Sequence, residues 1–124
     1  MGTKRITVPA DKLDLYRRLL ESTPVVAEKA NFGSAYTAVN GNMTSMISKH
    51  GVVGIRLPPA EREAFMAQYE TDLFRGDPAW PPAREFVAVP DALLEDTDGL
   101  RPYLEMAYRY ALTLKPKTKA TKTR

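Results

Sequence analysis

The dipeptide Asn40-Gly41 constrains the fold more than any other feature of this sequence. A type I′ turn needs positive φ at both central positions, and asparagine followed by glycine is a pair that readily adopts it. The extended segments 32–39 and 43–48 on either side are therefore predicted to pair as antiparallel strands. Lys49-His50-Gly51 predicts a second reversal, which leads into a third strand over 52–57.

The third strand is predicted to have one buried face. Val53, Ile55 and Leu57 alternate along it, so they share a side that we expect to face the core, while Arg56 points to the other side. Pro58-Pro59 ends this strand, because proline has no N–H to donate to a neighbouring strand.

Prolines and capping residues also place three helices in the sequence. Proline is well tolerated in the first turn of a helix, which predicts one helix from about Pro9 and a second from Pro59. The last helix is expected to be capped by Thr97 or Asp98. The predicted helices cover about residues 9–22, 59–72 and 98–114.

A fourth strand is predicted over 85–90, after a proline-rich loop at 75–83. The expected fold is α+β, with a four-stranded, largely antiparallel sheet backed by helices in the order α-β-β-β-α-β-α. Residues 1–114 are expected to form a single domain, because a chain of 124 residues needs only one core and shows no repeat of fixed period.

The positive charge of the chain is confined to its C-terminal end. The sequence holds 18 lysines and arginines and 15 acidic residues. Five of the basic residues lie in 115–124, which contains no acid, so the rest of the chain carries 13 basic groups against 15 acidic ones. We interpret residues 115–124 as a solvated, disordered tail.

The alternative interpretation is that this tail binds nucleic acid. Clustered lysine and arginine displace counterions from a phosphate backbone. The tail has no aromatic residue on which a base could stack, so such binding would be weak and indifferent to sequence. The candidate nucleic-acid-binding residues are Lys115, Lys117, Lys119, Lys122 and Arg124.

The sequence assigns no catalytic, cofactor-binding or metal-binding residue. There is no cysteine, and His50 is the single histidine, so it lacks a second strong ligand for a metal and any recognisable acid that would orient it as a base. We interpret it as a turn residue. Asp96-Thr97-Asp98-Gly99 lacks the further ligand positions of a calcium loop, and helix capping is the favoured interpretation. No phosphate-binding glycine loop or nucleophile elbow occurs.

Two apolar features are candidates for partner contacts. Trp80, in the loop at 75–83, is either a ligand platform or, as we favour, a lid packed over the sheet edge. The last helix is apolar over a wide arc that includes Met106 and Tyr110. We expect such a helix to pack against both its own sheet and a second copy of the chain, which predicts a homodimer.

Three segments carry a family resemblance. They are Asn31-Phe32-Gly33-Ser34, Val53-Gly54-Ile55-Arg56-Leu57 and Glu85-Phe86-Val87-Ala88-Val89-Pro90, the last followed by a tyrosine-rich helix. In this order they resemble the N-terminal domain of the TfoX/Sxy proteins, a bacterial family linked to regulation of natural competence. The resemblance covers residues 28–114. Asn31 and Ser34 depart from the family's strand motif, and the second, C-terminal domain of full-length members is missing.

The resemblance implies the fold given above and a non-enzymatic, regulatory or partner-binding role with an unidentified protein partner. It brings no catalytic residues and no cofactor. Nucleic-acid binding through the tail is the alternative function. The sequence has no apolar stretch long enough for a membrane span or a signal peptide, so we expect a cytoplasmic protein without a membrane partner.

Overall fold

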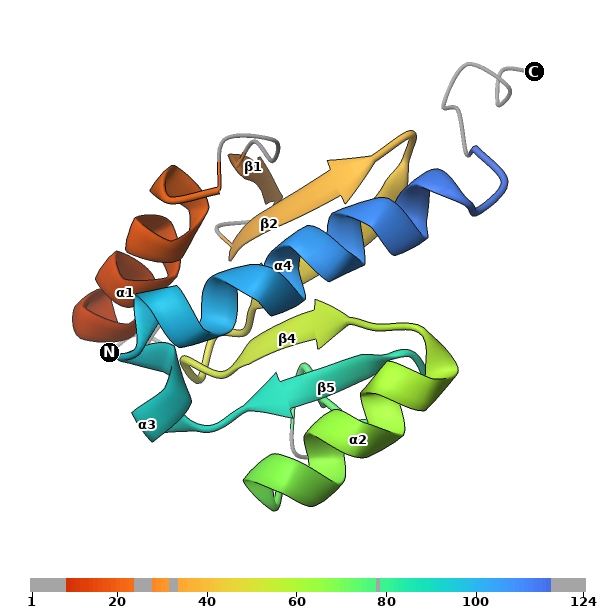
Figure 1. Cartoon of the computed structure of the whole chain (residues 1–124). Helices are drawn as coiled ribbons and strands as arrows, with labels where there is room; N and C mark the ends of the chain where they lie inside the picture. Colours follow the sequence, from red (N-terminus) through yellow and green to blue (C-terminus); the bar gives the residue numbers. More distant parts are fainter. Residues whose placement is uncertain (1–8, 24–27, 32–33, 78, 117–124) are drawn as a thin grey trace.

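The computed structural model describes residues 9–23, 28–31, 34–77 and 79–116, which form one sheet and the helices that cover it (Figure 1). In chain order the elements are α1 (Ala10–Glu21), β1 (Glu28–Asn31), β2 (Ser34–Val39), β3 (Asn42–Ile47), β4 (Val53–Arg56), α2 (Pro59–Tyr69), β5 (Phe86–Val89), α3 (Asp91–Leu94) and α4 (Thr97–Leu112). The strands follow one another across the sheet, and every neighbouring pair is antiparallel. The predicted α+β class, with an antiparallel sheet backed by helices, is confirmed.

One face of the sheet carries the core, and α1 to α4 all contribute to it. Val53, Ile55 and Leu57 are fully buried, as their alternation predicts. The helical residues of the same cluster are Tyr16, Leu19 and Leu20 from α1, Phe65 from α2, Leu93 and Leu94 from α3, and Leu100, Leu104 and Ala107 from α4. α4 runs across the sheet between α1 and α2 (Figure 1).

The turn at Asn40-Gly41 has the predicted geometry, with φ of 53° at Asn40 and 81° at Gly41. The strand before it was predicted to begin at residue 32, whereas β2 begins at Ser34; residues 32 and 33 lie outside the described part of the chain. β1 pairs with β2 at the edge of the sheet and was not predicted. Its sequence, Glu-Lys-Ala-Asn, has no apolar alternation, and an edge strand needs only one neighbour.

α2 is three residues shorter than predicted, since it ends at Tyr69 and not at residue 72. Glu70, with φ of 52°, adopts the left-handed conformation that commonly terminates helices. The chain then becomes extended, and Leu73 pairs with Val87 along the outer edge of β5. Pairing with the sheet therefore competes with the last turn of the predicted helix.

The segment before α4 differs from the prediction in two details. α3 is a single turn, too short to leave a periodic pattern in the sequence, yet it buries Leu93 and Leu94. The cap of α4 is Asp96, whose Oδ1 accepts the N–H of Gly99 at 3.0 Å. Capping by Thr97 or Asp98 is therefore wrong, although helix capping does explain this acidic segment.

Residues of the wide apolar arc of α4 contact other parts of the same chain. The ring of Tyr103 stands edge-on to Phe65 of α2 at 4.9 Å, and Met106 packs against the core. Tyr110 donates from its hydroxyl to Glu85. These contacts occupy part of the arc, whereas Leu112 near its C-terminal end is 49% exposed. No helix among the described residues is long and apolar enough to cross a membrane.

A buried chain of hydroxyl groups lies between α1 and the β2–β3 hairpin. The pairing shifts after Thr37, so that both Thr44 and Ser45 lie opposite it, as in a β-bulge. Thr37 Oγ1 is 2.5 Å from Thr44 Oγ1 and 2.7 Å from Ser45 Oγ, which in turn is 2.7 Å from the hydroxyl of Tyr16. All four side chains are fully buried, and each is hydrogen-bonded.

Candidate functional site

The loop between α2 and β5 is fixed against the face of the sheet opposite the helices. Gly54 alternates with the core residues of β4, and Phe74 lies directly over it, only 1% exposed. A Cβ atom at Gly54 would come within 2.6 Å of the Phe74 ring, so only glycine leaves room for it. The N–H of Phe74 bonds Phe86 O and its carbonyl accepts the N–H of Ala83, both at 2.8 Å.

Trp80 projects from this fixed loop into solvent, with 59% of its surface exposed. Its backbone N–H donates to Asp77 O at 2.9 Å, and Arg75 Nη1 donates to its carbonyl. The indole lies beside Gly76, where a side chain would crowd it. The prediction that Trp80 is a lid packed over the sheet edge is wrong, because most of the indole is exposed to solvent. The aromatic ring that packs on the sheet is that of Phe74, over Gly54 of β4.

The same loop supplies an acid partner for His50, which the sequence did not reveal. His50 lies in the β3–β4 turn, as predicted, and its Nε2 is 3.6 Å from Asp77 Oδ2. The N–H of Ala79, which bonds Asp77 Oδ1, holds the pKa of Asp77 below its usual value, and His50 adds to this. Within the described residues no three His, Asp or Glu side chains gather as metal ligands.

A second feature, the arginine corner, lies where β4 ends and β5 begins, and consists of Arg56, Arg62, Arg84, Glu85 and Tyr110. Arg56 donates from Nε and Nη2 to Glu85 Oε1 at 2.8 and 2.7 Å. The hydroxyl of Tyr110 donates to Glu85 Oε2 at 3.3 Å, so residues from the sheet and from α4 share one carboxylate. Arg56 Nη1 also reaches the carbonyl of Met43 at 3.2 Å.

The charges of the arginine corner shift its acid and its phenol in opposite directions. Burial alone would raise the pKa of Glu85, but Arg56, Tyr110 and Arg62 together hold that pKa below its usual value. The pKa of Tyr110 is raised by burial and then by the negative charge of Glu85. At neutral pH Glu85 is therefore ionised, Tyr110 is neutral, and the arginines outnumber the single carboxylate of the corner.

An open pocket of about 300 Å³ lies at the arginine corner. It is lined by Arg56, Ala83, Arg84, Glu85 and Phe86. The guanidinium of Arg56 stands over the Phe86 ring, 5.7 Å from its centre, a distance at which the cation is attracted to the ring face. Arg84 is exposed and forms no hydrogen bond or ion pair within the described part of the chain. Its charge is thus available to a ligand.

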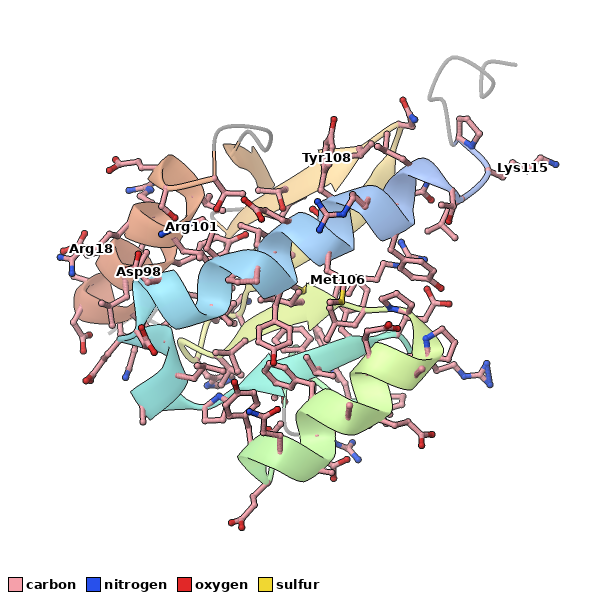
Figure 2. The ribbon with its side chains drawn as sticks, viewed as in Figure 1. Arg18, Asp98, Arg101, Met106, Tyr108 and Lys115 are labelled. Atoms are coloured by element: carbon pink, nitrogen blue, oxygen red, sulfur yellow. The ribbon has the colours of Figure 1, made fainter. Side chains whose placement is uncertain are left out.

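Of the five candidate residues in the tail, only Lys115 lies within the described residues. Its side chain is exposed, and its carbonyl accepts from Asn42 Nδ2 at 3.0 Å. Lys117, Lys119, Lys122 and Arg124 lie outside the described residues. Figure 2 shows Lys115 beyond the C-terminal end of α4, at the opposite end of the molecule from Arg18.

The sequence did not predict the arginine corner. Alternation along β4 correctly places Arg56 opposite the core, but nothing in the local pattern pairs it with a residue 29 positions away. Glu85 was predicted only as the first residue of the fourth strand, and no role was predicted for Arg84. The remaining signal for this pairing was the position at which β5 starts. If β5 pairs antiparallel with β4, the first residues of β5 lie beside the last residues of β4.

Comparison of the chain with protein-family models, with curated proteins and with solved structures finds no match. Its function is therefore inferred from the exposed tryptophan, the arginine corner and the tail.

Proposed function

We propose that the protein is a non-catalytic interaction or regulatory module that binds a cytoplasmic protein partner through Trp80. The supporting observation is the 59% exposure of the indole on a loop whose two ends are held at the sheet by the backbone bonds of Phe74. The resemblance of residues 28–114 to the TfoX/Sxy N-terminal domain supports a regulatory role of the same kind.

An exposed tryptophan on a fixed loop is well suited to protein recognition. Tryptophan is among the residues that most often dominate the energy of an interface, because it buries a large area and also offers an N–H donor. The backbone around Trp80 is already held by Asp77 and Arg75, so little conformational freedom is lost on binding.

We expect Trp80→Ala to weaken capture of the natural partner by at least about 30-fold, because loss of an interface hot spot costs roughly 2 kcal/mol or more. The measurement is affinity capture from the native cytoplasm with quantitative mass spectrometry, followed by titration of the partner identified. Leu112→Ala is the matched control, since Leu112, at 49%, is the other large exposed hydrophobic residue among those the structure describes, and it lies on α4.

Equal capture by the Trp80 variant and the wild type would contradict the proposal, as would equal losses in both variants. Light scattering of the same samples tests whether the partner is a second copy of the chain. A mass near twice 13.8 kDa that falls to the monomer value in Trp80→Ala would show that the partner is a second copy bound through Trp80; a dimer that persists in Trp80→Ala would instead fit the predicted contact through α4.

The second candidate function is sequence-indifferent binding of nucleic acid by the tail. The observation that favours it is the hydrogen bond from Asn42 to the Lys115 carbonyl, since it fixes the start of the tail beside the arginine corner. Asn42 precedes Met43, whose carbonyl is bonded by Arg56. The lysines of the tail and the arginines of the body would thus act from the same end of the molecule.

We expect a chain that ends at Pro116 to lose most of its affinity for single-stranded DNA at low salt. Four cations are removed, so the slope of log affinity against log salt should shrink by about 3. Fluorescence anisotropy over a salt series measures both quantities. Lys115 and its bond to Asn42 are retained, so an unchanged melting curve serves as the folding control. Failure of the intact chain to bind at low salt would contradict this function.

A further inference from the structure

We propose that the surface around Trp80 binds an acidic segment of the partner protein, with an apolar side chain of that segment packed on the indole and its carboxylates paired with Lys49 and Arg75. This inference rests on the proposed function and adds the chemistry of the partner to it. The surface consists of Lys49 and His50 from the β3–β4 turn and of Arg75, Asp77 and Trp80 from the loop after α2, and we call it the tryptophan patch.

Contacts within the described residues bring the two segments of the tryptophan patch together. His50 Nε2 lies 3.6 Å from Asp77 Oδ2. Lys49 precedes His50 and is close enough to Asp77 to help lower the pKa of its carboxyl group. Arg75 donates from Nη1 to the Trp80 carbonyl, and the N–H of Trp80 donates to Asp77 O. The cationic side chains of Lys49 and Arg75 therefore belong to the surface that carries the indole.

The positive charges of the tryptophan patch are available to a partner, whereas its negative charge is engaged. Lys49 and Arg75 are exposed, and neither forms an ion pair within the described part of the chain. Arg75 bonds a neutral carbonyl, which leaves its charge intact. Asp77 is the single acid of the patch; its Oδ1 accepts the N–H of Ala79, and His50 faces its Oδ2. At neutral pH the patch is thus net positive on a body that holds more acids than bases.

The tryptophan patch also offers an apolar surface. The indole of Trp80 is 59% exposed, and its chain neighbours Ala79 and Pro81 are exposed as well. Protein interfaces commonly combine an apolar centre with a polar rim, and tryptophan is a frequent anchor of the centre. An apolar side chain packed on the indole would displace water and so strengthen the attraction between nearby carboxylates and the two cations. A segment that carries acids beside an apolar residue matches both features.

The charges favour an acidic protein segment over a nucleic-acid strand. A strand carries a phosphate at every nucleotide, so some phosphates would lie beside the ionised Asp77 and the acidic body. A protein segment can carry its carboxylates only opposite Lys49 and Arg75. The patch also offers one large aromatic ring, whereas proteins that bind single strands commonly supply several rings on which successive bases stack.

Trp80 is the single tryptophan of the chain, so its fluorescence reports contact at the tryptophan patch. The probe is the synthetic peptide Glu-Glu-Leu-Leu-Glu-Glu, titrated into the full chain at low salt, and its matched counterpart is Lys-Lys-Leu-Leu-Lys-Lys. We expect the acidic peptide to produce a saturable change in fluorescence and the basic peptide to bind at least about tenfold more weakly. The affinity for the acidic peptide should fall as the salt concentration rises.

Lys49→Gln is expected to weaken binding of the acidic peptide about two- to fivefold, because one exposed ion pair is lost. Arg18→Gln is the matched control: it removes the same charge from an exposed residue of α1, which covers the other face of the sheet (Figure 2). It should change the affinity by less than about twofold, since salt screens distant charges. Arg75→Gln should weaken binding as Lys49→Gln does, whereas Arg75→Lys, which keeps the charge, should retain most of the affinity.

Equal binding of the acidic and the basic peptide would overturn the inference, as would equal effects of Lys49→Gln and Arg18→Gln. The absence of any fluorescence change with the acidic peptide would also overturn it. In each case the proposed function stands if capture of the natural partner still depends on Trp80, and it fails if capture does not. Tighter binding of an oligothymidylate than of the acidic peptide would assign the patch to nucleic acid and so overturn the acidic partner.

Discussion

Ile55→Asp is expected to leave the protein unfolded or close to unfolded at room temperature. Ile55 is fully buried in β4, between Ser45 of β3 and Val87 of β5. A carboxylate there would have neither water nor a cationic partner, which costs at least about 4 kcal/mol. Small domains are stabilised by only about 5–15 kcal/mol, so the loss is a large part of the total. Urea unfolding followed by circular dichroism measures it.

Ile55→Val is the control for this experiment. It keeps an apolar, β-branched side chain and removes one methylene, which is expected to cost about 1 kcal/mol. A melting curve for Ile55→Asp that matches the wild type would mean that residue 55 faces solvent and that the pairing of β4 is wrong.

Phe74→Ala is expected to destabilise the protein by about 3–5 kcal/mol, although Phe74 lies in a loop. The ring is 1% exposed, packs on Gly54 and lies 6.5 Å from the ring of Phe86. Its removal opens a cavity on the face of the sheet opposite α1 to α4. A shift of the urea midpoint with an unchanged slope would show the loss of stability directly.

Gly54→Ala provides the matched test of this packing. The new methyl group collides with the Phe74 ring, and we expect a cost of about 1–3 kcal/mol in the wild-type background. When Phe74 is already alanine, the same methyl group enters the vacated space and should cost far less. Additive effects in the double variant would contradict direct packing of Phe74 on Gly54.

Local chemistry in the sequence was enough to predict most of the sheet. Asn40-Gly41 needs positive φ, and the observed angles supply it. The alternation of Val53, Ile55 and Leu57 identified the buried face of β4 because side chains of a strand point alternately to its two sides. β1 left no such trace because its sequence, Glu-Lys-Ala-Asn, has no apolar alternation, and α3 left none because a single helical turn is too short to show a period.

The candidate sites were harder to predict because they depend on contacts between distant residues. Arg56 and Tyr110 meet at Glu85 across 29 and 25 residues, and His50 meets Asp77 only because the loop after α2 returns over the sheet. From the sequence, Trp80 was predicted as the lid, whereas Phe74, for which no role was predicted, packs on the sheet. The sequence indicates that an aromatic residue near that loop covers the sheet. Which aromatic ring does so depends on the space above Gly54, which the ring of Phe74 occupies.

The hydroxyl chain at the β2–β3 bulge also stabilises the correct register of the β2–β3 hairpin. Strands built largely from Ala, Thr, Ser and Met have few large apolar residues to hold them in one alignment, and a slip by one residue would turn every side chain to the opposite face. Such a slip would break the hydrogen bond between Thr37 and Ser45. It would also break the hydrogen bond between the Tyr16 hydroxyl and Ser45. The bulge thus makes the wrong alignments costly, and it discourages this part of the sheet from pairing with the strands of other molecules during folding.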